Sequence, residues 1–159
     1  SLELGELGFP TPATVGCGTI EAIEEGRTFY PPSNGCVELK EKISEYLAEH
    51  SGIGYSSDEV LLTPGPSLGL DDAIRAYVSD GDEVLIPKPA YGFYSTLVGL
   101  SGGIPVFAPT YEVNEWALHA DDLKEAITPK TKMLLLNYPN NPTRSVITDK
   151  QFAVIAEIS

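Results

Sequence analysis

The sequence predicts an α/β fold with three layers, α/β/α, around a mostly parallel sheet. Short strand-like runs alternate with helical stretches of about ten residues, a pattern typical of parallel sheets with crossover helices. The run 133–136 is apolar without polar alternation, as expected for a strand buried on both faces. Right-handed crossovers would place the helices on the two faces of this sheet.

The first part of the chain is less regular than the rest. Residues 1–20 are rich in Gly, Pro and Thr and predict an extended arm, followed by a short helical turn over 20–25. Residues 28–35 contain two prolines and a glycine and predict a loop. Residues 37–50 have apolar side chains at helical spacing, with Lys and Glu on the opposite face. They predict an amphipathic helix that Gly52 ends.

From residue 59 onward, strands and helices alternate, separated by turn sequences such as Asp80-Gly81-Asp82 and Gly102-Gly103. The predicted strands are 59–63, 83–87, 104–108 and 133–136. The predicted helices are 70–78, 89–100, 123–127 and 149–158, with Asp121-Asp122 capping the third. A polar stretch over 111–118 predicts a short hairpin edge.

Composition narrows the class of protein. With 159 residues, 42% of them hydrophobic, the chain is long enough for one domain with a core. The formal net charge of −13 argues against nucleic acid or an anionic membrane as the main partner. Cys17 and Cys36 have no metal-ligand or disulfide-framework spacing, which favours reduced thiols and a cytoplasmic location. No apolar stretch predicts a membrane span. The chain starts without Met and stops inside a helical pattern, so we expect a piece of a longer polypeptide.

Three polar loops follow predicted strands. They are Gly65-Pro66-Ser67, Pro89-Ala90-Tyr91 and the asparagine loop, residues 137–143. If the strands are parallel, all three loops leave the sheet at its carboxyl edge, where open α/β sheets bind ligands. The asparagine loop also contains two prolines, which fix the backbone and make the loop stiff.

Each loop offers a different chemistry. Free N–H groups at the helix start near Gly65 and Ser67 suit a phosphate monoester, although Pro66 cannot donate. Tyr91 can stack on a planar heteroaromatic ring. The amides of Asn137 and Asn141 can donate to a phenolate oxygen. Together the three loops predict a site for a phosphorylated aromatic cofactor. Taken singly, each also has an ordinary interpretation: a helix cap at Gly65, core packing of Tyr91 on Phe93 or Tyr94, and a turn at the asparagines.

The asparagine loop, Asn137-Tyr138-Pro139-Asn140-Asn141-Pro142-Thr143, resembles the N-x-P-x-N-P-T signature of class I/II aminotransferases. These are fold-type I enzymes that use pyridoxal 5'-phosphate (PLP). Other segments match the family in order and spacing: 4–12, 30–39, 63–70, 81–84 and 89–91. The resemblance implies that residues 1–35 are an amino-terminal arm and lead-in. Residues 36–159 would then be the first half of the large PLP-binding domain.

The resemblance also implies roles for individual residues. Asn141 would hydrogen-bond the phenolic oxygen of PLP, Tyr91 would stack on its ring, and Gly65, Pro66 and Ser67 would hold its phosphate. Asn137 belongs to the same loop. Gly5, with Asn141, would lie near the substrate. Tyr30 would reach the phosphate in a neighbouring subunit, so a homodimer is expected.

The sequence departs from the family pattern at several positions. Arg144 follows Asn-Pro-Thr where the family has Gly, Leu7-Gly8 replaces Pro-Asp, and Lys40 replaces Arg. The lysine that forms the Schiff base with PLP would fall beyond Ser159, because none of the seven lysines has Ser three residues earlier. This chain alone is therefore expected to be inactive, with no catalytic residue of its own.

The favoured function is amino-group transfer between an amino acid and a 2-oxo acid, as part of amino-acid metabolism or biosynthesis. One alternative is a PLP-dependent carbon–sulfur lyase or an enzyme similar to aminocyclopropane-carboxylate synthase. Another is the non-catalytic, effector-binding module of a transcription regulator, which would need a DNA-binding domain before Ser1. An inert, degenerate fragment is a further alternative.

Overall fold

The computed structural model describes residue 5 and residues 7–158. The chain divides into two compact units, residues 1–62 and 63–159. The predicted domain boundary between residues 35 and 36 stays a prediction, because a compact unit is not by itself a domain.

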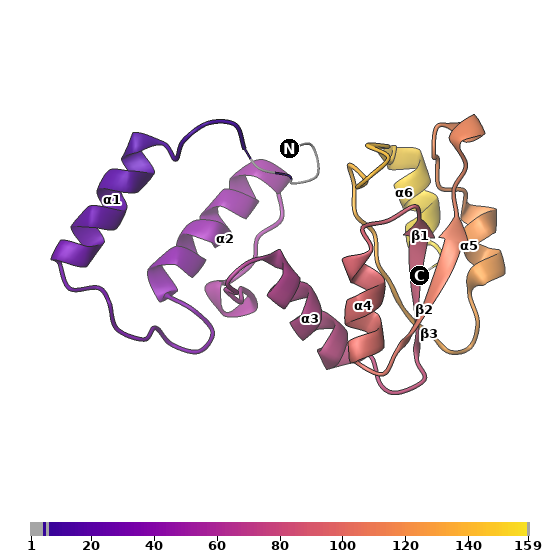
Figure 1. Cartoon of the computed structure of the whole chain (residues 1–159), viewed down its shortest axis with the longest axis horizontal. Coiled ribbons are helices and arrows are strands. Elements are labelled where there is room, and N and C mark those ends of the chain that lie inside the picture. Colours follow the sequence, from indigo (N-terminus) through magenta and orange to yellow (C-terminus); the bar gives the residue numbers. More distant parts are fainter. Residues whose placement is uncertain (1–4, 6, 159) are drawn as a thin grey trace. The chain divides into compact units, whose positions relative to one another are not determined.

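The second unit is built on a parallel sheet, as predicted. Its described strands are β1 (Glu83–Lys88), β2 (Ile104–Pro109) and β3 (Thr131–Leu134), in the order β2-β1-β3 (Figure 1). The central strand β1 pairs in parallel with both neighbours, and Leu85 lies opposite Val106 on one side and Leu134 on the other. All three strands therefore end at the same edge of the sheet.

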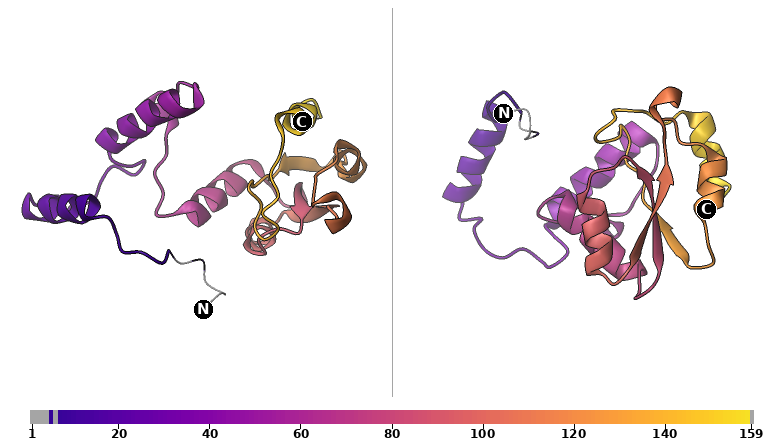
Figure 2. Two further views of the ribbon diagram at one scale, coloured as in Figure 1. Left: turned by 90° about the horizontal axis from the view of Figure 1, so that it is seen from above. Right: turned by 45° about the vertical axis from the view of Figure 1, so that its right-hand side comes forward.

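Helices cover both faces of this sheet, which confirms the predicted three layers (Figures 1 and 2). One face carries α3 (Pro66–Tyr77) and α4 (Phe93–Leu100), and the other carries α5 (Ala120–Ala126) and α6 (Asp149–Ala156). A short 3-10 helix, η2 (Glu112–Asn114), follows β2. None of the helices in the described part of the chain is long and apolar enough to cross a lipid bilayer.

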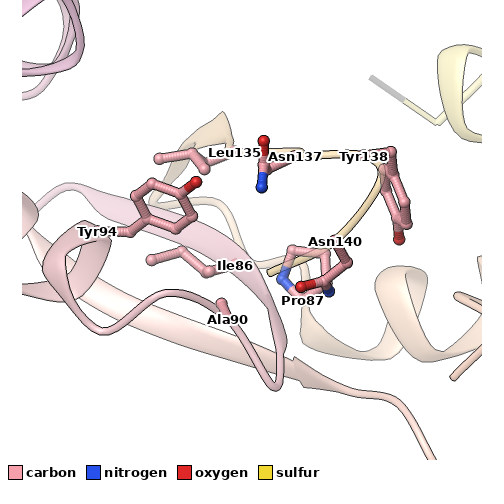
Figure 3. Close-up of a pocket in the computed structure, with 8 residues that line it drawn as sticks. All are labelled: Ile86, Pro87, Ala90, Tyr94, Leu135, Asn137, Tyr138 and Asn140. Atoms are coloured by element: carbon pink, nitrogen blue, oxygen red, sulfur yellow. The ribbon is translucent and has the colours of Figure 1, made fainter. Parts of the chain in front are cut away.

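Strand β1 supplies the core on both faces through the two-residue period of a strand. Val84 and Ile86 join one apolar cluster with Ile74 of α3 and Leu97 of α4. Figure 3 shows Ile86 close to Leu135 and Tyr94 on this side. The intervening Leu85 joins a second cluster with Ala108, Leu118, Leu123 and Ile155. Residues 84–86 are at most 1% exposed, so β1 is the buried centre of the unit.

The first unit contains two longer helices, α1 (Ala13–Glu24) and α2 (Val37–Ser51), and a 3-10 helix, η1 (Ser57–Glu59). Helix α2 matches the prediction and ends at Gly52, whose φ of 70° gives a left-handed cap that glycine accepts without strain. Helix α1 has no buried residue and leaves Val15, Ile20 and Ile23 more than half exposed.

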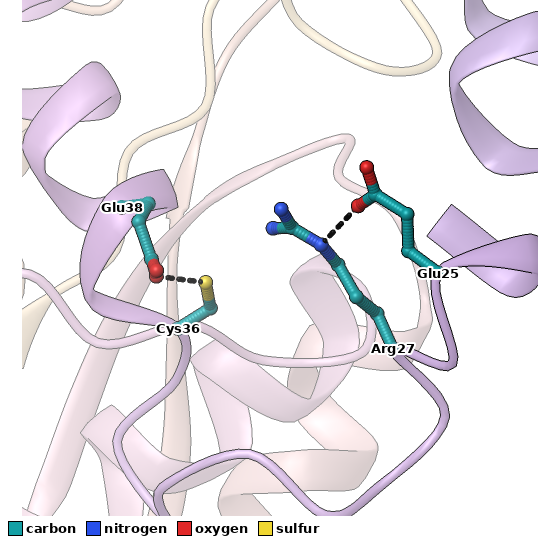
Figure 4. Close-up of polar contacts among 4 residues, drawn as sticks. All are labelled: Glu25, Arg27, Cys36 and Glu38. Atoms are coloured by element: carbon teal, nitrogen blue, oxygen red, sulfur yellow. Dashed lines mark hydrogen bonds and ion pairs between the residues drawn. The ribbon is translucent and has the colours of Figure 1, made fainter. Parts of the chain in front are cut away.

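The loop that joins α1 to α2 carries a polar contact at each end (Figure 4). At its start, Arg27 Nε donates to Glu25 Oε2 at 2.8 Å. At its end, the thiol of Cys36 donates to Glu38 Oε2 at 2.8 Å. The Cys36 hydrogen bond is the main cause that lowers the pKa of Glu38 from its ordinary value of 4.5, and the charge of Arg27 acts in the same direction.

Two predictions about the first 63 residues were wrong. Residues 13–24 form a helix, where an extended arm was expected up to residue 20. The glycines at positions 16 and 18 interrupt the apolar pattern and hide its helical spacing. Residues 59–63 do not form a strand: Val60 is extended, but no described strand pairs with this segment. Leu62 N–H donates instead to Asn34 O at 3.3 Å.

The hairpin edge predicted over 111–118 is also absent from the described structure. The backbone turns through η2, and both Glu115 and Trp116 adopt positive φ angles of 53° and 60°. The N–H groups of Asn114 and Trp116 both donate to Tyr111 O at 3.0 Å, so the segment closes on itself instead of pairing as a strand.

We expect Gly103→Ala to destabilise the fold, because Gly103 is buried and its surroundings leave no room for a side chain. An added Cβ would lie 2.7 Å from Val78 Cγ1 and 3.1 Å from Val98 Cγ1. Overpacking of this kind costs about 1–3 kcal/mol of the free energy of unfolding. Gly99→Ala is the matched control. Gly99 lies exposed in α4, where an added Cβ would meet no atom within 4 Å, so this variant should stabilise the fold by about 0.5–1 kcal/mol. Urea denaturation of both variants measures the difference, and equal midpoints would contradict the packing described above.

We also expect Cys36→Ala to raise the pKa of Glu38 toward 4.5, because it removes the main cause of the lowering. A lowered folded-state pKa stabilises the fold above the unfolded-state value, and this stabilisation is lost as pH falls through the folded-state value. The variant should therefore lose this pH dependence below about 4.5. Carboxyl-carbon NMR titration checks the shift, with Cys17→Ala on α1 as the control that leaves Glu38 unchanged.

Candidate functional site

Two of the predicted site loops leave the same edge of the sheet. The segment Pro89-Ala90-Tyr91 follows the carboxyl end of β1, and the asparagine loop follows β3, its parallel neighbour. A hydrogen bond joins them: the side-chain amide of Asn140 donates from Nδ2 to Pro89 O at 3.0 Å. The predicted convergence of these two loops is therefore present in the structure.

The tip of the asparagine loop is closed by backbone hydrogen bonds at Asn140. Its N–H donates to Ser145 O at 2.9 Å, and its carbonyl accepts from Arg144 N–H at 2.7 Å. The hydroxyls of Thr143 and Ser145 lie 2.9 Å apart within the same turn. These contacts leave Asn141 exposed at the tip, where its amide is free to meet a ligand.

Arg144 has a backbone conformation that is unusual for a residue other than glycine. Its φ angle is 61°, a left-handed conformation that glycine adopts at no steric cost. Arg144 therefore adopts a backbone conformation that would suit the glycine expected here from the family resemblance. Its side chain is exposed.

The structure is compatible with both interpretations of Tyr91, packing on neighbouring rings and stacking on a ligand. Its ring packs against Tyr94 edge-on, with centroids 5.6 Å apart, and lies 6.2 Å from the ring of Phe93. The side chain is nevertheless 49% exposed. Neighbouring rings thus fix the orientation of Tyr91 while leaving part of it able to stack on a planar ligand.

The space between these two loops is too small for a cofactor. A narrow pocket of about 10 Å³ lies between the two loops, room for no more than one water (Figure 3). Its lining is Ile86, Pro87, Ala90, Tyr94, Leu135, Asn137, Tyr138 and Asn140. A wider hollow of about 290 Å³ lies beside Tyr91, between Lys88, Ser95 and Phe107. A ring-shaped ligand would therefore lie on the exposed side of the loops.

Burial changes the pKa of the two tyrosines that line the narrow pocket. It raises the pKa of Tyr94, with a smaller contribution from Tyr91, and it also raises the pKa of Tyr138. Both phenols therefore stay protonated at neutral pH and add no negative charge near the site.

The predicted phosphate segment lies at the start of α3. Gly65 is the N-cap with a φ of 103°, Pro66 is the first helical residue, and Ser67 follows it. All three are exposed, and the first turn of α3 contains no acidic residue. The strand that was expected before this segment is absent. Strand pairing therefore does not place this loop at the edge of the sheet. Thr63 supports it by donating from Oγ1 to Gly65 O at 3.0 Å.

Tyr30 and Gly5 belong to the first unit. Tyr30 is fully exposed, with nothing in its unit covering the ring, and Gly5 has no atom within 4 Å of an added Cβ. Leu4, part of the arm that resembles the family, lies outside the described residues. The predicted roles of Tyr30 and Gly5 stay predictions.

Sequence reasoning missed Asn140 as the residue that joins the two loops. It is only 9% exposed and makes the bond that joins the two loops, whereas its neighbours Asn137 and Asn141 are exposed. The number of asparagines could have indicated this role, because three amides in one short loop are more than a single ligand contact needs.

Comparison with known proteins gives a consistent result along the whole chain. The family model described as aminotransferase class I and II matches residues 4–159. Aromatic-amino-acid aminotransferase 2 of Thermococcus litoralis is 39% identical over 160 residues, and aspartate aminotransferase of Pyrococcus abyssi is 41% identical. Both alignments cover 100% of this chain and 41% of the relative, so the chain spans about two fifths of the length of these proteins.

Solved structures agree with the sequence matches. The aromatic aminotransferase from Pyrococcus horikoshii superposes with a TM-score of 0.95 at 40% identity, covering 99% of this chain and 42% of that one. An aspartate aminotransferase variant from Thermus thermophilus gives a TM-score of 0.95 at 32% identity, covering 98% and 41%. These matches confirm the predicted α/β fold as part of the fold of type I aminotransferases. On sequence and structure together, the chain belongs to the class I and II aminotransferase family.

Proposed function

We propose that the protein is a PLP-dependent aminotransferase, and that the loops after β1 and β3 form one wall of its cofactor site. The observation that carries the proposal is the Asn140–Pro89 hydrogen bond between these loops. It holds an exposed aromatic ring, Tyr91, and an exposed amide, Asn141, on one edge of a parallel sheet. Open α/β sheets bind ligands at this edge.

The residues of this chain suit the groups of PLP. The Asn141 amide can donate to the phenolic oxygen, and the exposed part of the Tyr91 ring can stack on the pyridine ring. Ser67 offers its hydroxyl and backbone N–H to the phosphate, at a helix start without a competing carboxylate. When bound, PLP supplies an electron-withdrawing ring that makes the α-proton of an amino acid easier to remove. Tyr91 and Asn141 orient that ring, and Tyr91 also shields one side of it from water.

The proposed substrates are an amino acid and a 2-oxo acid, with Gly5 and Asn141 near the substrate. The matched relatives are named for aromatic amino acids and for aspartate at nearly equal identity, 39% and 41%. This part of the chain therefore does not distinguish among amino-acid substrates. Because these relatives all bear the name aminotransferase, transamination is favoured over the lyase and regulator alternatives.

We further propose a homodimer with Tyr30 reaching the phosphate in the neighbouring subunit. The neighbouring aromatic side chains of Phe29 and Tyr30 are both almost fully exposed, and a contiguous exposed apolar patch of this kind supports an interaction surface. The free thiols of Cys17 and Cys36 fit the proposed cytoplasmic location.

Asn141→Ala should weaken equilibrium binding of PLP by about tenfold or more, because hydrogen bonds to charged groups contribute roughly 1.5–3 kcal/mol. Tyr91→Ala should weaken it by about three- to tenfold through lost stacking. Equilibrium dialysis with the full-length protein measures both. The matched controls are Asn114→Ala and Tyr77→Ala, at exposed positions of η2 and α3. Equal dissociation constants for the site variants and their controls would remove the cofactor assignment.

Borohydride reduction of the 159-residue chain with PLP should label no single lysine preferentially. Of the chain's lysines, Lys40 is 2% exposed, and Lys42 pairs with Glu45 at 2.6 Å. The Nζ of Lys88 lies 5.0 Å from the centroid of the Phe107 ring. Peptide mass mapping checks the result, and one dominant modified lysine would show that the chain contains its own attachment site.

A further inference from the structure

Asn140 and Asn141 are adjacent in sequence but face different environments. Asn140 is 9% exposed and lines the narrow pocket between the loops (Figure 3). Asn141 is exposed at the tip of the turn. A ligand on the exposed side can therefore meet Asn141, while Asn140 is turned toward the protein. The buried amide needs a function other than ligand contact.

Three hydrogen bonds concentrate on Asn140. Its side chain donates to Pro89 O at 3.0 Å, across 51 positions in the sequence. Its backbone N–H and carbonyl close the turn through Ser145 and Arg144, at 2.9 Å and 2.7 Å. One residue thus fixes the shape of the turn that presents Asn141 and also ties that turn to the segment that presents Tyr91.

The bond to Pro89 depends on a donor at this position. Pro89 lies two residues before Tyr91, and its carbonyl is an acceptor only, so the residue at position 140 must supply the hydrogen. The bond lies in a partly buried region, where an unpaired carbonyl is costly. If it is lost, the two loops keep their own strands but are no longer held at a fixed separation.

We infer that Asn140 is a positioning residue for the cofactor site, acting through Asn141 and Tyr91 without contacting the cofactor. Its amide sets the distance between the donor at the loop tip and the stacking ring, so that both meet the same planar ligand. The inference rests on the proposed function, because it assumes that this ligand is PLP.

The test uses three variants of the full-length protein. Asn140→Asp keeps the shape but replaces the donor by a carboxylate, which can only accept. Asn140→His places a ring nitrogen at the same position along the side chain and can donate again. Asn114→Asp makes the same chemical change at an exposed position and controls for the added charge.

The expected loss for Asn140→Asp is about tenfold in PLP affinity, and Asn140→His and Asn114→Asp should stay within about threefold of the wild type. In an Asn141→Ala background, Asn140→Asp should cost less than about twofold, because without the Asn141 donor its distance from the Tyr91 ring no longer affects binding. A general structural defect would lower affinity by the same factor in both backgrounds. Additive effects would therefore overturn the inference, as would an Asn140→Asp variant that binds PLP like the wild type.

Amide hydrogen exchange without cofactor separates this inference from the proposed function. Asn140→Asp should speed exchange both in 138–146 and in 88–96, while Asn114→Asp changes neither. Unchanged exchange in 88–96 would overturn the inference even if PLP binds. Failure of the wild type to bind PLP would instead overturn the proposed function, and the exchange result would still decide whether Asn140 joins the loops.

Discussion

The parallel pairing of β1 with both neighbours is the constraint on which the second unit depends. Because β1 is central, its side chains are buried on both faces, with Val84 and Ile86 toward α3 and α4 and Leu85 toward α5 and α6. Because β3 runs in the same direction, the loops after the two strands leave one edge of the sheet. The position of the candidate site is thus a consequence of core packing, and polar residues could occupy these loops without disturbing the core.

The sequence predicted the first two strands of this unit well, because both are mainly apolar runs bounded by turn residues, but it placed the third over 133–136, whereas β3 is Thr131–Leu134. The strand predicted over 83–87 extends one residue further, and that predicted over 104–108 does the same. The segment 59–63 has similar composition but forms no strand. A strand requires a hydrogen-bonded neighbour, and periodicity reports burial without reporting a partner. The same limit applies to α1, whose helical spacing is interrupted by glycines and whose apolar side chains remain exposed.

The candidate site was predictable as a set of residue types but not as an arrangement. The segments 89–91 and 137–143 predicted Tyr91, Asn137 and Asn141 as site residues, and the structure shows all three exposed near one sheet edge. The sequence could not distinguish Asn140 from Asn141, because both are asparagines next to each other in a turn. Only the path of the backbone shows that one amide points toward Pro89 and the other toward solvent. Identical side chains therefore have different functions according to the direction that the turn gives them.

The distribution of acidic residues gives a physical reason why an anionic cofactor could bind to a chain with a net charge of −13. On one face of the sheet, α5 and α6 have acidic residues in their first turns: Asp121, Asp122 and Asp149. On the other face, α3 and α4 begin without any, and their starts are the predicted phosphate segment and the turn that follows Tyr91. Carboxylates near a helix start neutralise its positive end. At α3 and α4 that positive end is left uncompensated, so the backbone donors there remain available to a phosphate despite the overall negative charge.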